Sequence, residues 1–222
     1  HRGAFFLMDN VGFLNFFDKP RNEPAAKNPP INPTFDIKDT YDFYRKLGPI
    51  RHVNDSILFN QSKIWNEYLE HNTKDAYWQA RDIRKHLSGI SPAVLVVGGW
   101  FDAEDMFGAL KTYEAIETQN KANKNYLLMG PWTHGAWAGR NFSQYATYQF
   151  GSNTTETFKA LEARFFNFFL KGKGDFDAPE ATIFFTGINR WSNFSTWPPK
   201  NTSAFDLYPA AGNTLSDKPA KS

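Results

Sequence analysis

The chain contains no cysteine, which excludes disulfide bonds, thiolate-bound zinc and a cysteine nucleophile. Long apolar runs are also missing: the longest, residues 93–101, is far short of the about 20 residues that a membrane helix needs. Bases and acids nearly cancel, at 25 against 23, and no basic run is interleaved with aromatic residues. We therefore expect a globular protein with no nucleic-acid partner and no membrane partner.

Aromatic residues, in contrast, make up 17% of the chain, enough for a large core and an aromatic-lined pocket. A length of 222 residues corresponds to one large domain or two small ones, at about 150 residues per domain. The chain opens on His1 and Arg2 with neither a methionine nor a signal-like region. We therefore expect a piece cut from a longer polypeptide, and no targeting segment is readable at this end.

Residues 1–90 alternate helical patterns with loops rich in proline and asparagine. Aromatic residues recur at helical spacing over 41–47 and 64–69, and residues 77–87 place apolar positions between lysine and arginine. None of these patterns is typical of a strand. The sequence predicts a helical, loop-rich subdomain.

Residues 91–174 alternate apolar runs with amphipathic segments. The runs at 93–98 and 125–130 are short and continuous, as is typical of parallel strands buried on both faces. An apolar stripe at helical spacing follows each run, over 106–116 and 155–170. Strand, helix, strand, helix predicts an α/β fold with a parallel sheet.

Residues 175–222 differ in residue pattern from both preceding regions. The change follows the Lys-Gly-Lys-Gly segment at 171–174. We expect strands over 181–186 and 204–208, with tryptophan- and proline-containing loops between them. This pattern predicts the opening of an antiparallel β-sandwich, with too few strands to close a stable sheet.

A candidate catalytic group follows each predicted buried strand: Asp102 after the first and His134 after the second. Both side chains should reach one edge of the sheet, because ligands bind beyond the carboxyl ends of parallel strands. An aspartate followed by a histidine matches the last two members of the α/β-hydrolase triad, whose chain order is Ser, Asp, His. In that triad histidine takes the serine proton, while the carboxylate fixes the tautomer and stabilises the imidazolium.

Structural roles are the competing interpretations of these two residues. Asp102 alone is equally explained as a helix N-cap, with Asp105 as an imperfect capping-box partner. His134 alone is explained as a hydrogen-bonded structural histidine in a glycine-rich loop. The matched positions of the two favour the catalytic pair. The other histidines have no partner motif, which favours surface or packing roles for His1, His52, His71 and His86.

No Gly-x-Ser-x-Gly motif occurs in the chain; the nearest case, Gly89-Ile90-Ser91, continues with Pro92. In the α/β-hydrolase order the serine precedes the aspartate loop. We therefore expect the nucleophile upstream of His1, and no turnover by the 222-residue chain alone.

Two segments carry a family resemblance. Residues 99–109 and 128–134 resemble the C-terminal motifs of the α-amino-acid ester hydrolase group, within the wider family of cocaine esterases, glutaryl acylases and X-Pro dipeptidyl peptidases. Looser similarity to that family extends over the chain in collinear order, at 2–5, 75–79, 185–191 and 195–198.

The resemblance implies a three-part parent. Most of a helical cap would occupy residues 1–90, the last two strand–helix units of an α/β-hydrolase core 91–174, and the first strands of a C-terminal jelly roll 175–222. It further implies a small-molecule ester or amide substrate, no cofactor and no metal. A homo-oligomeric parent and a periplasmic or secreted bacterial location also follow from the resemblance.

Carried over by position, Asp102 is the triad acid and His134 the general base of a serine hydrolase. Glu104 and Asp105 match members of a carboxylate cluster that binds the substrate's α-ammonium in the α-amino-acid ester hydrolase group. Their alternative role is in the helix N-terminus, where the macrodipole favours acids. The esterase and glutaryl acylase branches need no such cluster, so both acids favour an α-amino acyl substrate.

Two other functions stay open from the sequence. In a non-catalytic binding module, Trp191, Phe194 and Trp197 would form an aromatic platform for a sugar. In a pseudo-enzyme, the parent would lack its serine. Hydrogen-bonding reach between the side chains of Asp102 and His134 would favour the triad.

Overall fold

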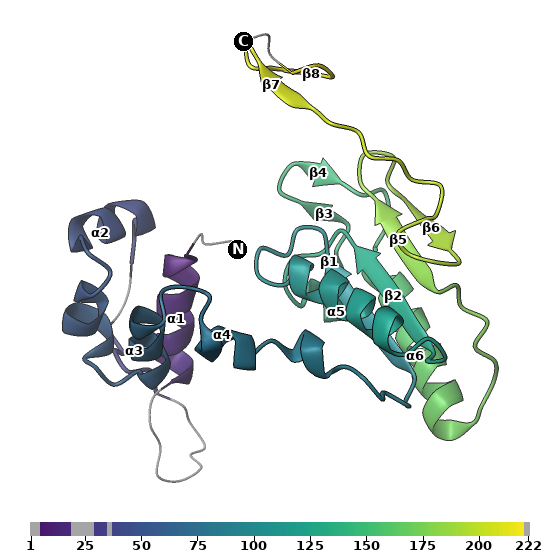
Figure 1. Ribbon diagram of the computed structural model, residues 1–222, viewed down its shortest axis with the longest axis horizontal. Helices are drawn as coiled ribbons and strands as arrows, with labels where there is room; N and C mark the ends of the chain where they lie inside the picture. The colour runs from purple at the N-terminus through teal and green to yellow at the C-terminus, as the bar shows by residue number, and fades with distance from the viewer. Residues whose placement is uncertain (1–4, 19–28, 35–36, 220–222) are drawn as a thin grey trace. The chain divides into compact units, whose positions relative to one another are not determined.

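The computed structural model describes residues 5–18, 29–34 and 37–219 (Figure 1). The chain divides into two compact units, His1–Asp82 and Ile83–Ser222. His1 and most of the 2–5 segment that resembles the family's cap lie outside the described residues.

The first unit is helical in its described part, as the sequence predicts. Its helices are α1 (Leu7–Phe17), α2 (Thr40–Leu47), the π-helical turn η1 (Asn54–Leu58), α3 (Lys63–Glu70) and α4 (Ala76–Ala80). Side-chain caps begin several of them: Ser62 Oγ accepts from the amide of Trp65, and Asp75 accepts from the amides that open α4. The buried core comprises Val11, Leu14, Ile31, Val53, Ile57, Leu58 and Trp65.

The helical prediction for residues 77–87 differs from the structure. Helix α4 ends at Ala80, and a separate 3₁₀ turn, η2 (Ile83–His86), follows in the second unit. No residue of either segment is buried, so no apolar stripe links the two turns into one packed helix.

A mixed sheet organises the second unit. In the described residues it has four strands in the order β1-β2-β5-β6: β1 (Val94–Gly99), β2 (Asn125–Gly130), β5 (Ala181–Phe185) and β6 (Arg190–Phe194). The first three are parallel, and β6 is antiparallel to β5. The strands predicted at 93–98 and 125–130 are β1 and β2, which pair directly.

Helices flank both faces of this sheet, and its central strands β2 and β5 are the most buried. Side chains alternate along β2: Leu127 and Met129 pack with Tyr113 of α5 (Met106–Gln119), whereas Leu128 packs with Phe158 of α6 (Thr155–Lys171). This two-sided burial explains why β1 and β2 read as continuous apolar runs.

The strand expected at 181–186 opens no separate sandwich in this structure. It is β5, which pairs in parallel with β2 in the central sheet, because α6 forms the crossover that a parallel connection requires. Of the residues 204–208 expected to form a strand, only Tyr208 lies in one, as the first residue of β7 (Tyr208–Ala210). This strand pairs with β8 (Thr214–Ser216).

Short elements complete the second unit between β2 and α6. They are the 3₁₀ turn η3 (Ala136–Ala138) and a two-stranded hairpin of β3 (Gln144–Tyr145) and β4 (Tyr148–Gln149). Among the described residues, no helix has the length and apolar character to cross a membrane.

Candidate active site

The site begins where β1 and β2 end. Gly99 and Gly130 are partners in the parallel ladder, and the amide of Trp100 donates to the carbonyl of Gly130 at 2.8 Å. The amide of Phe101 then donates to the carbonyl of Trp132 at 3.0 Å, so the pairing continues beyond the strands. The loops that follow the two strands therefore leave the sheet side by side.

Both glycines are required by this close approach. A Cβ on Gly99 would collide with the backbone carbonyl of Trp132, and one on Gly130 would lie 2.5 Å from the ring of Trp132. That ring is fully buried and its Nε1 donates to Thr154 Oγ1, so it has no room to give way.

Asp102 and His134 meet at this edge. His134 Nδ1 lies 3.0 Å from Asp102 Oδ2. The Asp102 side chain is 1% exposed, whereas that of His134 is 55% exposed. Because an ionised carboxylate only accepts hydrogen bonds, Nδ1 carries the proton, and Nε2 of the neutral ring keeps its lone pair on the accessible side.

The second oxygen of Asp102 binds the backbone of its own loop. Oδ1 accepts from the amide of Glu104 at 2.8 Å and from the amide of Asp105 at 2.9 Å. Asp102 is therefore not the N-cap of α5, a position that Asp105 occupies; its Oδ1 instead holds the turn before the helix, while Oδ2 is left for His134. This double anchoring fixes the orientation in which Oδ2 faces His134.

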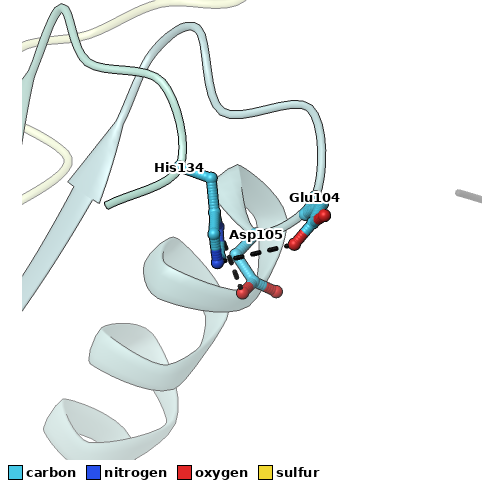
Figure 2. A group of neighbouring side chains, drawn as sticks. All are labelled: Glu104, Asp105 and His134. Carbon is cyan, nitrogen blue, oxygen red and sulfur yellow. Dashed lines mark ion pairs between the residues drawn. The ribbon is translucent and has the colours of Figure 1, made fainter. Parts of the chain in front are cut away.

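Glu104 and Asp105 extend toward the imidazole instead of capping the helix (Figure 2). Glu104 Oε2 lies 3.5 Å from His134 Nε2, and Asp105 Oδ2 lies 3.8 Å from His134 Nδ1. Helix α5 begins after Asp105, whose side chain accepts no capping hydrogen bond. The structure therefore gathers the other three predicted site residues around the imidazole of His134.

These contacts shift the pKa of both members of the pair. Burial raises the pKa of Asp102, but hydrogen bonds from the amides of Asp105 and Glu104 and from His134 outweigh it, so the pKa lies below its ordinary value. The hydrogen bond to Asp102 raises the pKa of His134; burial opposes this, and the charges of Asp102, Glu104 and Asp105 reinforce it. The site therefore favours Asp102 as an anion and stabilises positive charge on His134.

A second histidine–carboxylate pair lies in the first unit, where the sequence predicted none. His71 Nδ1 lies 2.6 Å from Asp75 Oδ2, and the His71 ring stacks on Tyr77 at 4.3 Å. Asp75 also caps α4, so this pair joins the end of α3 to the start of α4. The spacing of four residues was the available signal. His52 Nδ1 lies 2.8 Å from the carbonyl of Leu47, and His86 is exposed.

The aromatic residues of the proposed sugar platform belong instead to the cores of the second unit. Trp191 packs against the cluster of Leu128 and Trp132, with ring centroids 5.6 Å apart between the two tryptophans. Phe194 and Trp197 pack against the cluster on the α5 face. Their packing argues against a binding platform.

Comparisons with known proteins follow the same segments. Residues 31–136, which include Asp102 and His134, match the model of the X-Pro dipeptidyl-peptidase (S15) family. Cocaine esterase from Rhodococcus sp. (strain MB1 Bresler) is 29% identical over 151 residues, which are 65% of this chain and 25% of that protein. Over residues 31–136 the chain is similar to the S15 family. The resemblance read from the sequence is confirmed.

Solved structures of similar proteins agree with the fold. An aminopeptidase from the marine sediment archaeon Thaumarchaeota archaeon superposes with a TM-score of 0.84 at 25% identity, over 98% of this chain and 35% of that one. An α-amino acid ester hydrolase labelled with selenomethionine superposes with a TM-score of 0.83 at 27% identity. The match covers 98% of this chain and 36% of that one. The chain thus shares a mixed α/β sheet with these two hydrolases, and it spans about a third of the length of each.

Proposed function

We propose that the chain supplies the acid and the base of a serine-hydrolase triad, Asp102 and His134, for acyl transfer from esters or amides to water. The observation that carries the proposal is the 3.0 Å contact between His134 Nδ1 and Asp102 Oδ2 at the carboxyl ends of adjacent parallel strands. The kinship with an esterase and an aminopeptidase supports the same chemistry.

His134 Nε2 performs the proton transfers in this proposal. It takes the proton of the serine hydroxyl as the oxygen attacks the substrate carbonyl, and gives it to the leaving alcohol or amine. Water then repeats the sequence on the acyl-serine, with His134 again as base and then as acid. Asp102 holds the Nδ1–H tautomer and balances the charge of the imidazolium.

The serine in this proposal comes from outside the 222 residues, which contain no Gly-x-Ser-x-Gly motif. The triad order Ser, Asp, His requires it to precede Asp102 in the polypeptide. The groups that stabilise the oxyanion would come from the same region, because in this fold one donor is the amide that follows the serine.

We propose α-amino acyl compounds as the substrate class, with the α-ammonium held by Glu104 and Asp105. Two observations support this. Both carboxylates are about half exposed or more, at 49% and 67% of the side chain, and both face the imidazole at which the scissile bond would lie. Asp105 also makes no helix-capping hydrogen bond that would account for its position.

The substrate proposal is tested in the full polypeptide that carries the serine. Glu104→Gln combined with Asp105→Asn should lower kcat/KM about 10-fold or more for an α-amino ester, the scale of lost charge-assisted contacts. The matched ester without the amino group should change little. Glu114→Gln, at an exposed position of α5 whose carboxylate pairs with Lys111, is the control. Equal losses on both esters would contradict α-amino recognition.

A further inference from the structure

Two hydrogen-bond acceptors face each other in the site. His134 Nε2 lies 3.5 Å from Glu104 Oε2 (Figure 2). When Nδ1 donates its proton to Asp102, Nε2 of the neutral ring carries a lone pair, as does the carboxylate oxygen. Such a pair is repulsive unless a proton or a cation lies between the two atoms. The contact is therefore favourable in two states, with a proton on Nε2 or with a cation bound between the two atoms.

The distance between these acceptors fits a zinc ion. Zinc binds imidazole nitrogen and carboxylate oxygen at about 2.0–2.2 Å, so two ligands of a tetrahedral ion lie about 3.3 Å apart. The observed 3.5 Å is close to this separation. Ligand atoms of Glu104, Asp105 and His134 all lie within 4.8 Å of one another, and Asp105 is exposed enough to swing inward. Three protein ligands leave a fourth position for water.

Asp102 provides independent support, because it orients the histidine as metal-binding histidines are oriented. Such histidines almost always donate their second ring N–H to a carboxylate or carbonyl, which fixes the tautomer and makes the ligating nitrogen more basic. His134 Nδ1 has this partner in Asp102 Oδ2 at 3.0 Å. The buried Asp102 carboxylate is in turn held by two backbone amides. Nε2 is thus preorganised to bind a cation.

We propose that His134, Glu104 and Asp105 bind a divalent zinc ion, with Asp102 as the outer carboxylate. The ion occupies the Nε2 lone pair, so His134 cannot accept the proton of a nucleophile while the ion is bound. Zinc binding and acyl transfer exclude each other. The binding rests on the geometry alone, whereas the inhibition rests also on the proposed function.

Binding is measured on the 222-residue chain by calorimetric titration with zinc chloride. We expect a 1:1 complex that His134→Ala abolishes. Glu104→Gln should weaken it at least 10-fold, and Asp102→Asn should weaken it about 10- to 100-fold, the range for outer carboxylates. Glu114→Gln is the matched acid control. His71→Ala removes the other histidine–carboxylate pair and should leave the affinity unchanged.

Unchanged affinity in His134→Ala, or loss of binding in His71→Ala alone, overturns the site. Circular dichroism checks the fold of each variant, and if His134→Ala does not fold, Glu104→Gln decides. In the polypeptide that carries the serine, zinc should inhibit turnover and EDTA should restore it, with weaker inhibition in Glu104→Gln. Zinc binding at His134 without inhibition would contradict His134 as the general base and leave the metal site standing.

Discussion

Gly99 lies opposite Gly130 in the parallel ladder of β1 and β2, at the last position of each strand. The carbonyl of Trp132 occupies the space into which a Cβ on Gly99 would project. The two loops therefore leave the sheet at the same height. The number of residues in each loop then determines where Asp102 and His134 lie.

A methyl group at Gly99 should disturb both stability and the pair. We expect Gly99→Ala to lower the free energy of unfolding by about 1–3 kcal/mol, because the obstructing atom belongs to the backbone and cannot rotate away. Urea unfolding measures the loss. Gly12→Ala in α1 is the control: a Cβ there meets nothing within 4 Å, and alanine favours the helix. Equal stability changes would contradict the close approach of the loops.

The pKa of His134 should lie above its ordinary value in the metal-free chain, because Asp102, Glu104 and Asp105 all favour the charged ring. NMR titration of the imidazole protons in the presence of EDTA measures it. Asp102→Asn removes the first of these causes and should lower the pKa. If the pKa of His134 were the same in both proteins, the contact would not form in solution.

The same shift predicts a pH dependence of acyl transfer in the polypeptide that carries the serine. A general base acts only when deprotonated, so kcat/KM should fall as the pH drops through the pKa of His134. Since that pKa is raised, the fall should begin above the pH expected for an unperturbed histidine. The Glu104→Gln variant should shift the profile toward lower pH. A profile unmoved by this substitution would argue that Glu104 is too far away to act on the ring.

Loss of either member of the pair should slow the chemical step with little effect on the fold. In the serine-containing polypeptide, His134→Ala and Asp102→Asn should each lower kcat about 10⁴-fold. An asparagine at 102 presents an amide that stabilises the wrong tautomer. Steady-state kinetics with thermal unfolding as control separates catalysis from stability. Near-parental turnover in His134→Ala would refute its role as base.

The 222-residue chain alone should show no serine-hydrolase turnover. It contains no Gly-x-Ser-x-Gly motif, and an imidazole without an aligned nucleophile and oxyanion donors has little to activate. Incubation with an activated ester and with a serine-directed phosphonate tests this. Stoichiometric labelling of any serine would contradict the proposal that the nucleophile lies outside the chain.

The core of the second unit was predictable from the sequence, because its strands are buried on both faces. The run predicted at 125–130 is β2, with the same bounds, and the helical stripe predicted at 155–170 is α6 with one further residue. The sequence did not single out helix α1, because apolar residues lie on all sides of it and give no amphipathic pattern. Val11 and Leu14 are buried, whereas Phe13, Phe16 and Phe17 are exposed.

Strand partners were less predictable than strands. The pattern at 181–186 indicates a strand equally well in a sandwich or in the central sheet, and only the crossover through α6 decides for the latter. At the site, chain order was enough to bring Asp102 and His134 to one edge. Asp102 uses one carboxylate oxygen for His134 and the other for two backbone amides. This arrangement depends on the conformation of the loop, which residue spacing does not reveal.

The separate roles of the two Asp102 oxygens limit which sequence changes such a site can accept. Because the amides of residues 104 and 105 hold Asp102 in place, any insertion or deletion in this turn would release the carboxylate that orients His134. The side chains at 104 and 105 take no part in that anchoring, so they can be exchanged while the backbone keeps its path. Point substitutions at 104 and 105 can therefore change the substrate preference, whereas insertions or deletions in this turn would disrupt the catalytic pair.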